Sequence, residues 1–238
     1  MNNYIYGANS CRAAIESGHS IRALYIEKNN WRFIELAREK KIPYTLVEKE
    51  KLDRLGGLHQ GVAMEIAPIK AHDIADILRD RSAPDFREAF VIIADGIEDP
   101  HNFGAILRVA DAVGADGVIY RKTRGVGPNA TVVRVSTGAA FFVKCVEVVN
   151  LTAAIKRLKE AGFWVVGAES APESVDYREA EYDMATALVI GSEGKGLSRL
   201  VRENCDFLVR IPMRGRINSL NAAVAAGILA YHIKNAQK

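Results

Sequence analysis

Two stretches of the sequence place glycine and polar side chains directly after an apolar run. Residues 191–196 (GSEGKG) follow the apolar run 187–190, and residues 212–216 (PMRGR) follow the run 208–211. The second stretch continues through residues 218–221 (NSLN) into a series of small residues. Glycine lets the backbone approach a ligand closely, and ligands bind at the carboxyl ends of parallel strands. The two junctions therefore predict a binding site.

A third polar segment, residues 95–108 (DGIEDPHNFGAILR), also follows an apolar run. We expect Asn102 to open a helix and Arg108 to lie on the body of that helix. Taken alone, Asn102 could be a helix cap and Arg108 an ordinary surface arginine. A guanidinium at this place is also well suited to hold a phosphate with two hydrogen bonds.

The polar residues of the first two stretches have the same two interpretations. Glu193 could cap a helix that begins near Gly196, or it could contact a ligand. Ser219 and Asn221 could cap the helix that follows them, or they could shape a site. The spacing of the glycines differs from that of a nucleoside-triphosphate loop, because Lys195 is followed by glycine and not by serine or threonine.

The net charge of +3 is small, but the charge is distributed unevenly along the chain. Residues 100–145 hold six Lys/Arg against two Asp/Glu, and residues 193–238 hold eight against three. Residues 146–192 hold four against eight. The positive stretches coincide with the polar motifs, which favours a polyanionic partner near the site, although an ordinary solvated surface is the alternative.

Alternating apolar and amphipathic runs predict an α/β protein with two parts and a linker. Residues 1–66 form a small α/β unit whose first helix is capped by Asn9 or Ser10, and residues 67–88 form a linker with a short helix at 74–78. Residues 89–238 form a parallel sheet with helices on both faces. We expect strands at 90–94, 116–120, 142–148, 163–168, 187–191 and 207–211, and helices at 103–113, 129–136, 151–161, 196–203 and 219–235.

The composition favours a cytoplasmic protein with reduced thiols. Cys11, Cys145 and Cys205 are odd in number, widely spaced and without a metal-ligand pattern. No apolar run reaches the ~18–20 residues that span a bilayer, and the first residues do not resemble a signal peptide. We therefore expect no membrane association and no metal.

The three motifs together resemble those of the SpoU branch of the SPOUT RNA methyltransferases, over residues 90–238. Residues 99–108 resemble D-P-x-N-x-G-x-x-x-R, residues 191–196 resemble G-S-E-x-x-G, and residues 211–221 resemble I-P-M-x-G-x-x-x-S-L-N. Residues 1–66 resemble the ribosomal-protein-like substrate-binding domain of the bacterial enzyme that methylates a guanosine 2′-oxygen in 23S rRNA.

This resemblance implies a deep trefoil knot in the larger domain, a homodimer, and S-adenosyl-L-methionine as cofactor with S-adenosyl-L-homocysteine as product. The backbone groups implied to hold the adenosine are those of Gly191, Ile211 and Leu220. The remaining pocket residues implied by the resemblance are Thr137, Gly138, Ala168, Ile190, Met213, Ser219 and Ala223.

The implied reaction is methylation of a ribose 2′-hydroxyl in RNA. The catalytic residues implied by the resemblance are Arg108, Asn102, Glu193, Ser219 and Asn221. The residues expected to contact RNA are Arg121, Lys122 and Arg124 in a basic loop, and Arg12, His59 and Gln60 in the N-terminal unit. A guanosine of 23S rRNA is the expected target, and tRNA or a catalytically silent RNA-binding homologue are the alternatives.

Overall fold

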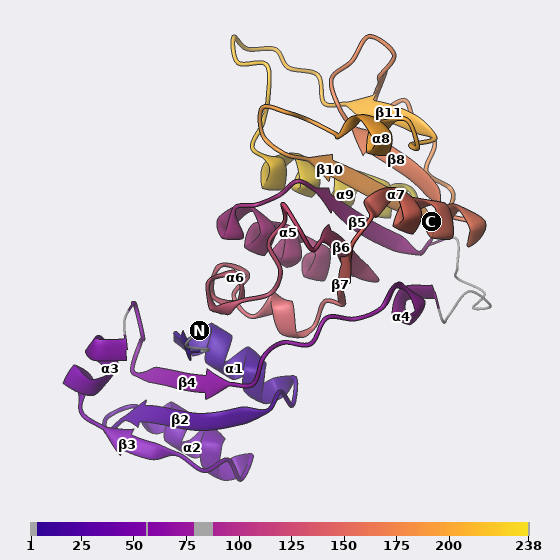
Figure 1. Ribbon diagram of the computed structural model, residues 1–238. Coiled ribbons are helices and arrows are strands. Elements are labelled where there is room, and N and C mark those ends of the chain that lie inside the picture. Colours follow the sequence, from indigo (N-terminus) through magenta and orange to yellow (C-terminus); the bar gives the residue numbers. More distant parts are fainter. Residues whose placement is uncertain (1–3, 56, 79–87, 238) are drawn as a thin grey trace. The chain divides into compact units, whose positions relative to one another are not determined.

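The computed structural model describes residues 4–55, 57–78 and 88–237 (Figure 1). Residues 79–87, which are part of the predicted linker, lie outside the described residues, whereas the short helix α4 (Ile74–Leu78) lies where the sequence predicted it. The chain divides into two compact units. The N-terminal unit contains residues 1–70 and 128–142, and the larger unit contains residues 71–127 and 143–238.

The N-terminal unit is built on a mixed four-stranded sheet with the order β1-β4-β2-β3. Strand β4 runs antiparallel to β1 and β2, and β2 runs parallel to β3. The elements are β1 (Tyr4–Tyr6), α1 (Ala8–Glu16), β2 (Ile21–Glu27), α2 (Trp31–Glu39), β3 (Thr45–Val47), α3 (Lys49–Leu55) and β4 (Val62–Ile66). The strand β1 was not predicted. The cap prediction was also wrong, because α1 begins after Gly7, whose φ of 96° ends the preceding strand.

A segment from the middle of the chain completes this unit. Helix α6 (Ala130–Val135) and the 3₁₀ helix η2 (Ala139–Phe141) pack on β1 and α1. The Arg134 guanidinium lies 5.6 Å from the centre of the Tyr6 ring, and the Phe141 and His19 rings lie 5.0 Å apart. The predicted domain limits, 1–66 and 89–238, assign residues 128–142 to the larger domain and not to the N-terminal unit. The limits stay a prediction.

The larger unit contains a seven-stranded parallel sheet with the order β7-β6-β5-β10-β8-β11-β9. The predicted parallel sheet is therefore confirmed, and the short strand β9 is an addition to it. The strands are β5 (Phe90–Asp95), β6 (Gly117–Arg121), β7 (Cys145–Val148), β8 (Trp164–Ala168), β9 (Val175–Asp176), β10 (Thr186–Gly191) and β11 (Phe207–Arg210).

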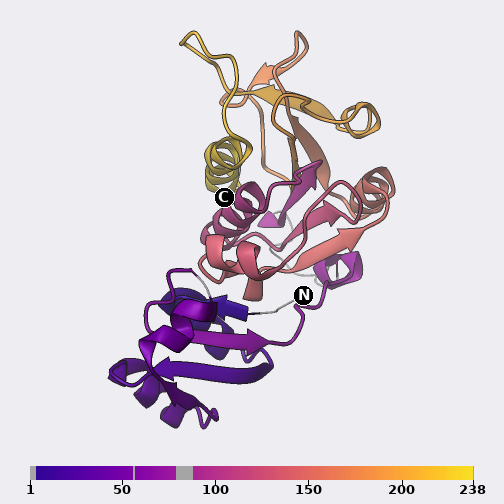
Figure 2. The same cartoon turned by 60° about the vertical axis from the view of Figure 1, so that its left-hand side comes forward.

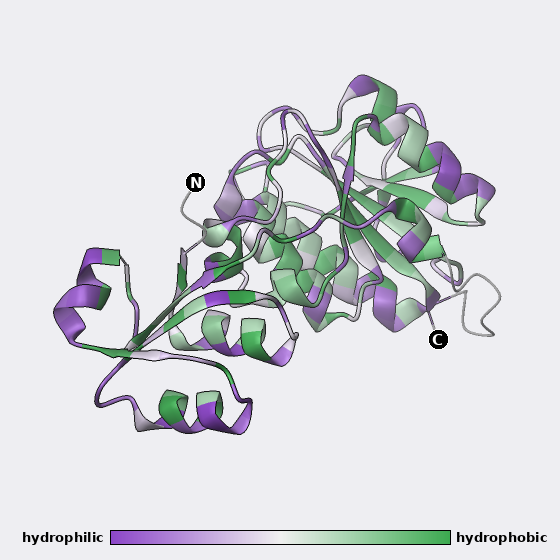
Figure 3. Cartoon of the chain, turned by 60° about the horizontal axis from the view of Figure 1, so that its bottom comes forward, coloured by the Kyte–Doolittle hydropathy of each residue, from purple (hydrophilic) through white to green (hydrophobic). Residues whose placement is uncertain are grey.

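Helices cover both faces of this sheet (Figure 2). Helices α5 (Pro100–Ala112) and α9 (Ala222–Ala236) pack on each other and cover one face. Helices α7 (Leu151–Glu160) and α8 (Arg199–Arg202), with α4, cover the other face. The central strand β5 is buried along its whole length, which explains its continuous apolar sequence. Figure 3 shows the resulting apolar interior and the polar outward faces of the helices.

Two helices begin three residues later in the structure than the sequence predicted. The helix predicted at 196–203 is reduced to α8, because residues 192–198 form a loop instead. The helix predicted at 219–235 begins at Ala222, because the segment 211–221 stays irregular. Within the described part of the chain, no helix has the length and apolar character needed to cross a membrane.

Replacement of Gly138 by alanine should destabilise the N-terminal unit strongly. Gly138 has a φ of 94°, and a Cβ there would lie 2.2 Å from the Cβ of Ala13. The left-handed backbone costs ~1–2 kcal/mol for a residue with a Cβ, and overpacking adds ~1–3 kcal/mol. Gly18→Ala is the matched control, because Gly18 has a φ of 69° but open space around it.

Urea unfolding followed by circular dichroism measures both variants. We expect Gly138→Ala to lose about 2 kcal/mol more than Gly18→Ala. Equal losses would show that the contact between Gly138 and α1 does not constrain the packing of the 128–142 segment.

Candidate active site

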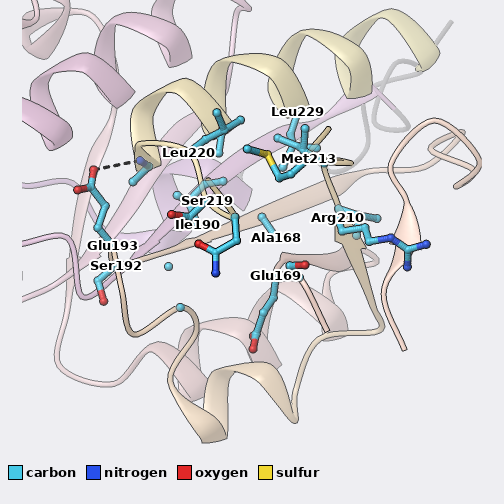
Figure 4. Close-up of a pocket in the computed structure, with 18 of the residues that line it drawn as sticks. Ala168, Glu169, Ile190, Ser192, Glu193, Arg210, Met213, Ser219, Leu220 and Leu229 are labelled. Atoms are coloured by element: carbon cyan, nitrogen blue, oxygen red, sulfur yellow. Dashed lines mark hydrogen bonds between the residues drawn. The ribbon is translucent and has the colours of Figure 1, made fainter. Parts of the chain in front are cut away.

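A cavity of about 420 Å³ opens at the carboxyl ends of β8, β10 and β11 in the larger unit (Figure 4). Ala168 ends β8 and is paired in register with both Ile190 and Val209, which lie one residue before the ends of β10 and β11. Adjacent parallel strands end at the same edge of a sheet, so the two glycine-containing junctions meet around one cavity. The cavity is lined by Ala168, Glu169, Ser170, Ile190, Gly191, Ser192, Glu193, Gly194, Gly196, Val209, Arg210, Ile211, Met213, Asn218, Ser219, Leu220, Ala222, Ala225 and Leu229.

Most of the residues predicted to hold the cofactor lie on this cavity. The lining residues among them are Ala168, Ile190, Gly191, Ile211, Met213, Ser219 and Leu220. Ala223 is buried in the first turn of α9, directly after the lining residue Ala222. Thr137 and Gly138 belong to the N-terminal unit and are not among the lining residues.

Several lining residues were absent from the sequence prediction. Glu169 and Ser170 follow β8 directly, Arg210 ends β11, and Ala225 and Leu229 lie on α9. The rule that ligands bind after parallel strands could have found Glu169 and Ser170, because their strand was predicted correctly. Nothing in the local sequence identified which face of α9 closes the cavity.

Glycines set the path of the loop between β10 and α8. A Cβ on Gly191 would lie 2.4 Å from the carbonyl carbon of Gly196, so the two ends of the loop can approach only without a side chain there. The Gly196 amide donates to the carbonyl of Ser192 over 3.0 Å. The buried carboxylate of Asp95, at the end of β5, accepts from the Ser198 amide over 2.6 Å and anchors the loop.

A cluster of three polar side chains joins this loop to two helices at the cavity. Glu193 Oε1 accepts from Asn102 Nδ2 over 3.2 Å and from Asn221 Nδ2. Asn221 Nδ2 also donates to Asn102 Oδ1 over 2.8 Å, and the Ala222 amide donates to Glu193 Oε1 over 3.3 Å. Figure 4 shows Glu193 beside the start of α9. Residues from all three sequence motifs therefore meet at one place.

Helix capping explains which of these side chains are available. The Asp99 side chain caps α5 by accepting from the His101 amide over 3.0 Å. The expectation that Asn102 opens the helix was therefore wrong: Asn102 lies within the first turn, and its amide is free for the cluster. Asn221 does cap α9, through Oδ1, while its Nδ2 reaches the cluster.

Glu193 contributes to the start of α9 through its bond from the Ala222 amide, and not to a helix that begins near Gly196. A carboxylate at a helix N-terminus is favoured by the helix dipole and by the unpaired amides there. Ser219 lines the cavity but does not cap the helix.

The segment that follows β8 carries a second carboxylate, that of Glu169. Glu169 Oε1 lies 3.4 Å from Arg202, and Glu169 Oε2 is buried without a hydrogen-bond partner among the described residues. The loop that follows is fixed by Ser174, whose hydroxyl donates to the Glu169 carbonyl over 2.6 Å and accepts from the Ala171 amide. A buried carboxylate oxygen without a partner is costly, so a ligand that supplies a donor is favoured here.

Thiol chemistry is disfavoured in this protein. Burial raises the pKa of the Cys145 and Cys205 thiols to about 12, and it raises the pKa of the Cys11 thiol further. All three cysteines are free. A neutral, enclosed thiol is a poor nucleophile and a poor metal ligand. No group of three or more residues suited to hold a metal ion occurs within 4–55, 57–78 and 88–237.

Arg108 is exposed on α5 and is available for an external anion. It makes no hydrogen bond or ion pair to any residue that the structure describes, and it shares its helix with Asn102. Arg121 ends β6, and Lys122 and Arg124 follow it in the basic loop. The Val126 amide, further along the same segment, donates to the Ile97 carbonyl just before α5. The basic loop is thus attached to the segment that leads into motif one.

The residues of the N-terminal unit expected to contact RNA differ in exposure. Arg12 is exposed on α1, and Gln60 is exposed while its Oε1 accepts from the Ala8 amide over 2.8 Å. His59 is buried: its Nδ1 accepts from the Gly61 amide over 3.0 Å, and its Nε2 lies 2.9 Å from Asp53. The structure therefore gives the His59 ring a role in shaping the loop.

Sequence models of two protein families match the chain. The model of the SpoU rRNA Methylase family matches residues 89–231, and the model described as RNA 2′-O ribose methyltransferase substrate binding matches residues 4–71. A relative from Staphylococcus haemolyticus, named for the TrmH family of tRNA/rRNA methyltransferases, is 45% identical over 235 residues. The match covers 96% of this chain and 94% of the relative.

Solved structures have the same fold over nearly the whole chain. The SpoU methyltransferase AviRb from Streptomyces viridochromogenes superimposes with a TM-score of 0.84 at 26% identity, over 99% of this chain and 90% of its own. The AdoMet-bound rRNA methyltransferase from Sinorhizobium meliloti gives a TM-score of 0.80 at 25% identity, over 98% of this chain and 87% of its own.

Two substitutions of Asn221 should separate its capping role from its role in the polar cluster. Asn221→Ala removes both and should cost about 1 kcal/mol of stability. Asn221→Ser keeps a capping oxygen and should stay close to wild type in stability, although it removes the amide that reaches Glu193. Denaturant midpoints of the two variants measure the difference, and equal losses would show that capping is not the stabilising contribution.

Proposed function

Because the chain belongs to the SpoU family of RNA methyltransferases, we propose that it methylates a ribose 2′-oxygen in RNA with S-adenosyl-methionine as the methyl donor. The observation that carries this proposal is that Asn102 and Asn221 both donate hydrogen bonds to Glu193, which lines the cavity formed by the two glycine-containing junctions. We further propose a guanosine of 23S rRNA as the target and the cytoplasm as the compartment.

The residues at the cavity fit this cofactor. Ile190, Met213 and Leu229 supply an apolar surface for an adenine ring, and the glycine-bordered loop allows the backbone to approach it. The unpaired oxygen of Glu169 can accept a hydrogen bond from a hydroxyl or an ammonium group. The Sinorhizobium meliloti relative was solved with AdoMet bound, which supports the same use of the pocket here. The trefoil knot around the pocket stays part of the proposal.

When bound, the cofactor supplies an electrophilic methyl group on a sulfonium. The protein then has mainly a positioning task, because a correctly aligned hydroxyl needs no metal for this transfer. Asn102 orients the target ribose, and Glu193 and Asn221 hold the Asn102 amide in place. Ser219 shapes the pocket beside them.

Arg108 holds the phosphate next to the target ribose and stabilises negative charge on the 2′-oxygen. A guanidinium stays protonated in proteins, so it is a poor proton acceptor but a strong partner for anions. Its exposure and its lack of a partner among the described residues agree with this role. The basic loop at Arg121, Lys122 and Arg124 extends the positive surface for the RNA backbone.

The N-terminal unit favours rRNA over tRNA. Its match to a substrate-binding family covers residues 4–71, and a relative described as an rRNA methyltransferase shares the fold over 98% of this chain. The Staphylococcus haemolyticus relative is named for both tRNA and rRNA, so tRNA is the alternative substrate. Mapping of 2′-O-methyl sites in cells that lack the protein decides between them: loss of a site in tRNA alone would contradict the rRNA assignment.

Arg108→Ala should abolish methyl transfer while leaving the affinity for S-adenosyl-homocysteine nearly unchanged. Transfer of radiolabelled methyl groups to RNA measures the activity, and calorimetric titration with S-adenosyl-homocysteine measures the affinity. Arg199→Ala is the matched control, because Arg199 is exposed and pairs with Glu203 instead of an external anion. Full turnover by Arg108→Ala would remove Arg108 from the proposed mechanism. A wild-type chain without any methyl transfer would instead indicate a catalytically silent RNA-binding protein.

We also propose that the protein is a homodimer formed through α9. Val224, Ile228 and Tyr231 are spaced along one face of this helix, and their exposed fractions are 50%, 36% and 50%. Residues three and four apart share a helix face, so these side chains form an exposed apolar stripe. The stripe begins three residues after Asn221, and a second copy seated on it would border the polar cluster.

Tyr231→Glu should convert the dimer to a monomer, because a buried unpaired carboxylate is costly. Light scattering coupled to size-exclusion chromatography measures the mass. Val149→Glu is the control, since Val149 is 76% exposed and directly follows β7, far from α9 in the sequence. A monomeric wild-type protein, or a Tyr231→Glu variant that remains dimeric, would contradict this interface.

A further inference from the structure

The N-terminal unit exposes a tryptophan that its own core does not use. Trp31 is the first residue of α2, and 64% of it is exposed. In the same unit, Leu58 is 87% exposed on the loop before β4. Tryptophan is on average a highly buried residue, so a ring with most of its surface in water indicates an external contact.

Hydrogen bonds join the start of α2, the loop 57–61 and the start of α1 into one surface. Asn30 caps α2 by accepting from the Phe33 amide, and its Nδ2 donates to the Gln60 carbonyl over 3.3 Å. The Gln60 side chain accepts from the Ala8 amide at the start of α1. A Cβ on Gly61 would lie 2.9 Å from Asn30 Nδ2, so the loop and the helix start are in close contact. Trp31 is therefore held next to a fixed loop.

Two arginines flank this surface without a carboxylate partner. The Arg32 guanidinium carbon lies 5.5 Å from the centre of the Trp31 ring, and that of Arg12 lies 6.0 Å from the Phe33 ring. Both are exposed, and neither forms an ion pair with a residue that the structure describes. A guanidinium that rests near an aromatic ring keeps its N–H groups available for an anion.

An exposed indole beside unpaired guanidinium groups suits single-stranded nucleic acid. Unstacked bases pack on aromatic side chains, and arginines nearby bind the phosphates that connect the bases. Tryptophan and arginine also occur at protein interfaces, but there they surround a buried apolar core. Here a single ring is accompanied by cations and exposed amides. The basic side chains thus decide for RNA.

We propose that Trp31 is the platform on which an unpaired nucleobase of the RNA substrate stacks, with Arg12 and Arg32 binding the adjacent phosphates. This inference rests on the proposed function, because it assigns the substrate-binding role to a particular surface of the N-terminal unit. Stacking tolerates any base, so the surface selects unpaired RNA and not a particular nucleotide sequence.

The test compares Trp31→Ala and Trp31→Phe in the full-length protein. The probes are fluorescently labelled 12-mers of oligouridylate and oligoadenylate and a 12-base-pair RNA duplex, titrated by fluorescence anisotropy. We expect Trp31→Ala to weaken binding of the single strands roughly ten-fold and Trp31→Phe to retain most of the affinity, since phenylalanine keeps an aromatic face. Binding of the duplex should change little.

A second readout reports on the ring itself. In a Trp164→Phe background, Trp31 is the remaining tryptophan of the chain, and single-stranded RNA should quench its fluorescence. Leu46→Ala is the matched control, because Leu46 is a 46% exposed apolar residue on β3 of the same unit. Titration of S-adenosyl-homocysteine should give the same affinity for all variants.

Unchanged single-strand affinity in Trp31→Ala would overturn the proposal, and so would an equal loss for single strands and the duplex. A protein contact at this surface would give the first of these outcomes. A third outcome combines two results: the wild-type protein transfers no methyl groups, and Trp31→Ala still weakens single-strand binding. That outcome would contradict the proposed function and would support RNA binding at this surface.

Discussion

The carboxylate of Glu193 connects the parts of the candidate site. One oxygen accepts from side chains on α5 and at the start of α9 and from the first backbone amide of α9. These donors come from two segments that are far apart in the sequence, and Glu193 lies on a third. Because a charged acceptor strengthens each hydrogen bond, this contact fixes the loop between β10 and α8 relative to both helices. The position of the Asn102 amide depends on it.

The parallel sheet makes this convergence possible. Strands β5, β8, β10 and β11 all run in the same direction, so the segments that follow them emerge at one edge. Small residues on α9 face its neighbours: buried alanines line the helix where it packs on α5, and even a Cβ added at Gly227 would lie 3.7 Å from Val109 of α5. Because α9 has small side chains and packs on α5, its N-cap residue Asn221 can reach Asn102.

The N-terminal unit, which matches a substrate-binding family, is built from two separate segments of the chain. Its sheet holds the starts of α1 and α2 at the same loop, and its packing is completed by residues 128–142 from within the catalytic part of the chain. Arg134 and Phe141 of that segment contact aromatic side chains of the N-terminal elements. The two structural units are thus formed by segments that alternate along the sequence.

The sequence by itself determined the parallel sheet, most of its strands and the polar residues of the three motifs. The spacing of apolar residues and of glycines along the chain, on which these predictions rest, is a local property. It did not determine two of the caps: Gly7 precedes α1 in place of the expected Asn9 or Ser10, and Asp99 caps α5 in place of Asn102, since backbone conformation at a cap depends on the preceding turn. Only the tertiary structure decided that Glu169 faces the cavity, that His59 is buried and that Trp31 is exposed. Burial is the sum of contacts from distant segments, and no local pattern contains it.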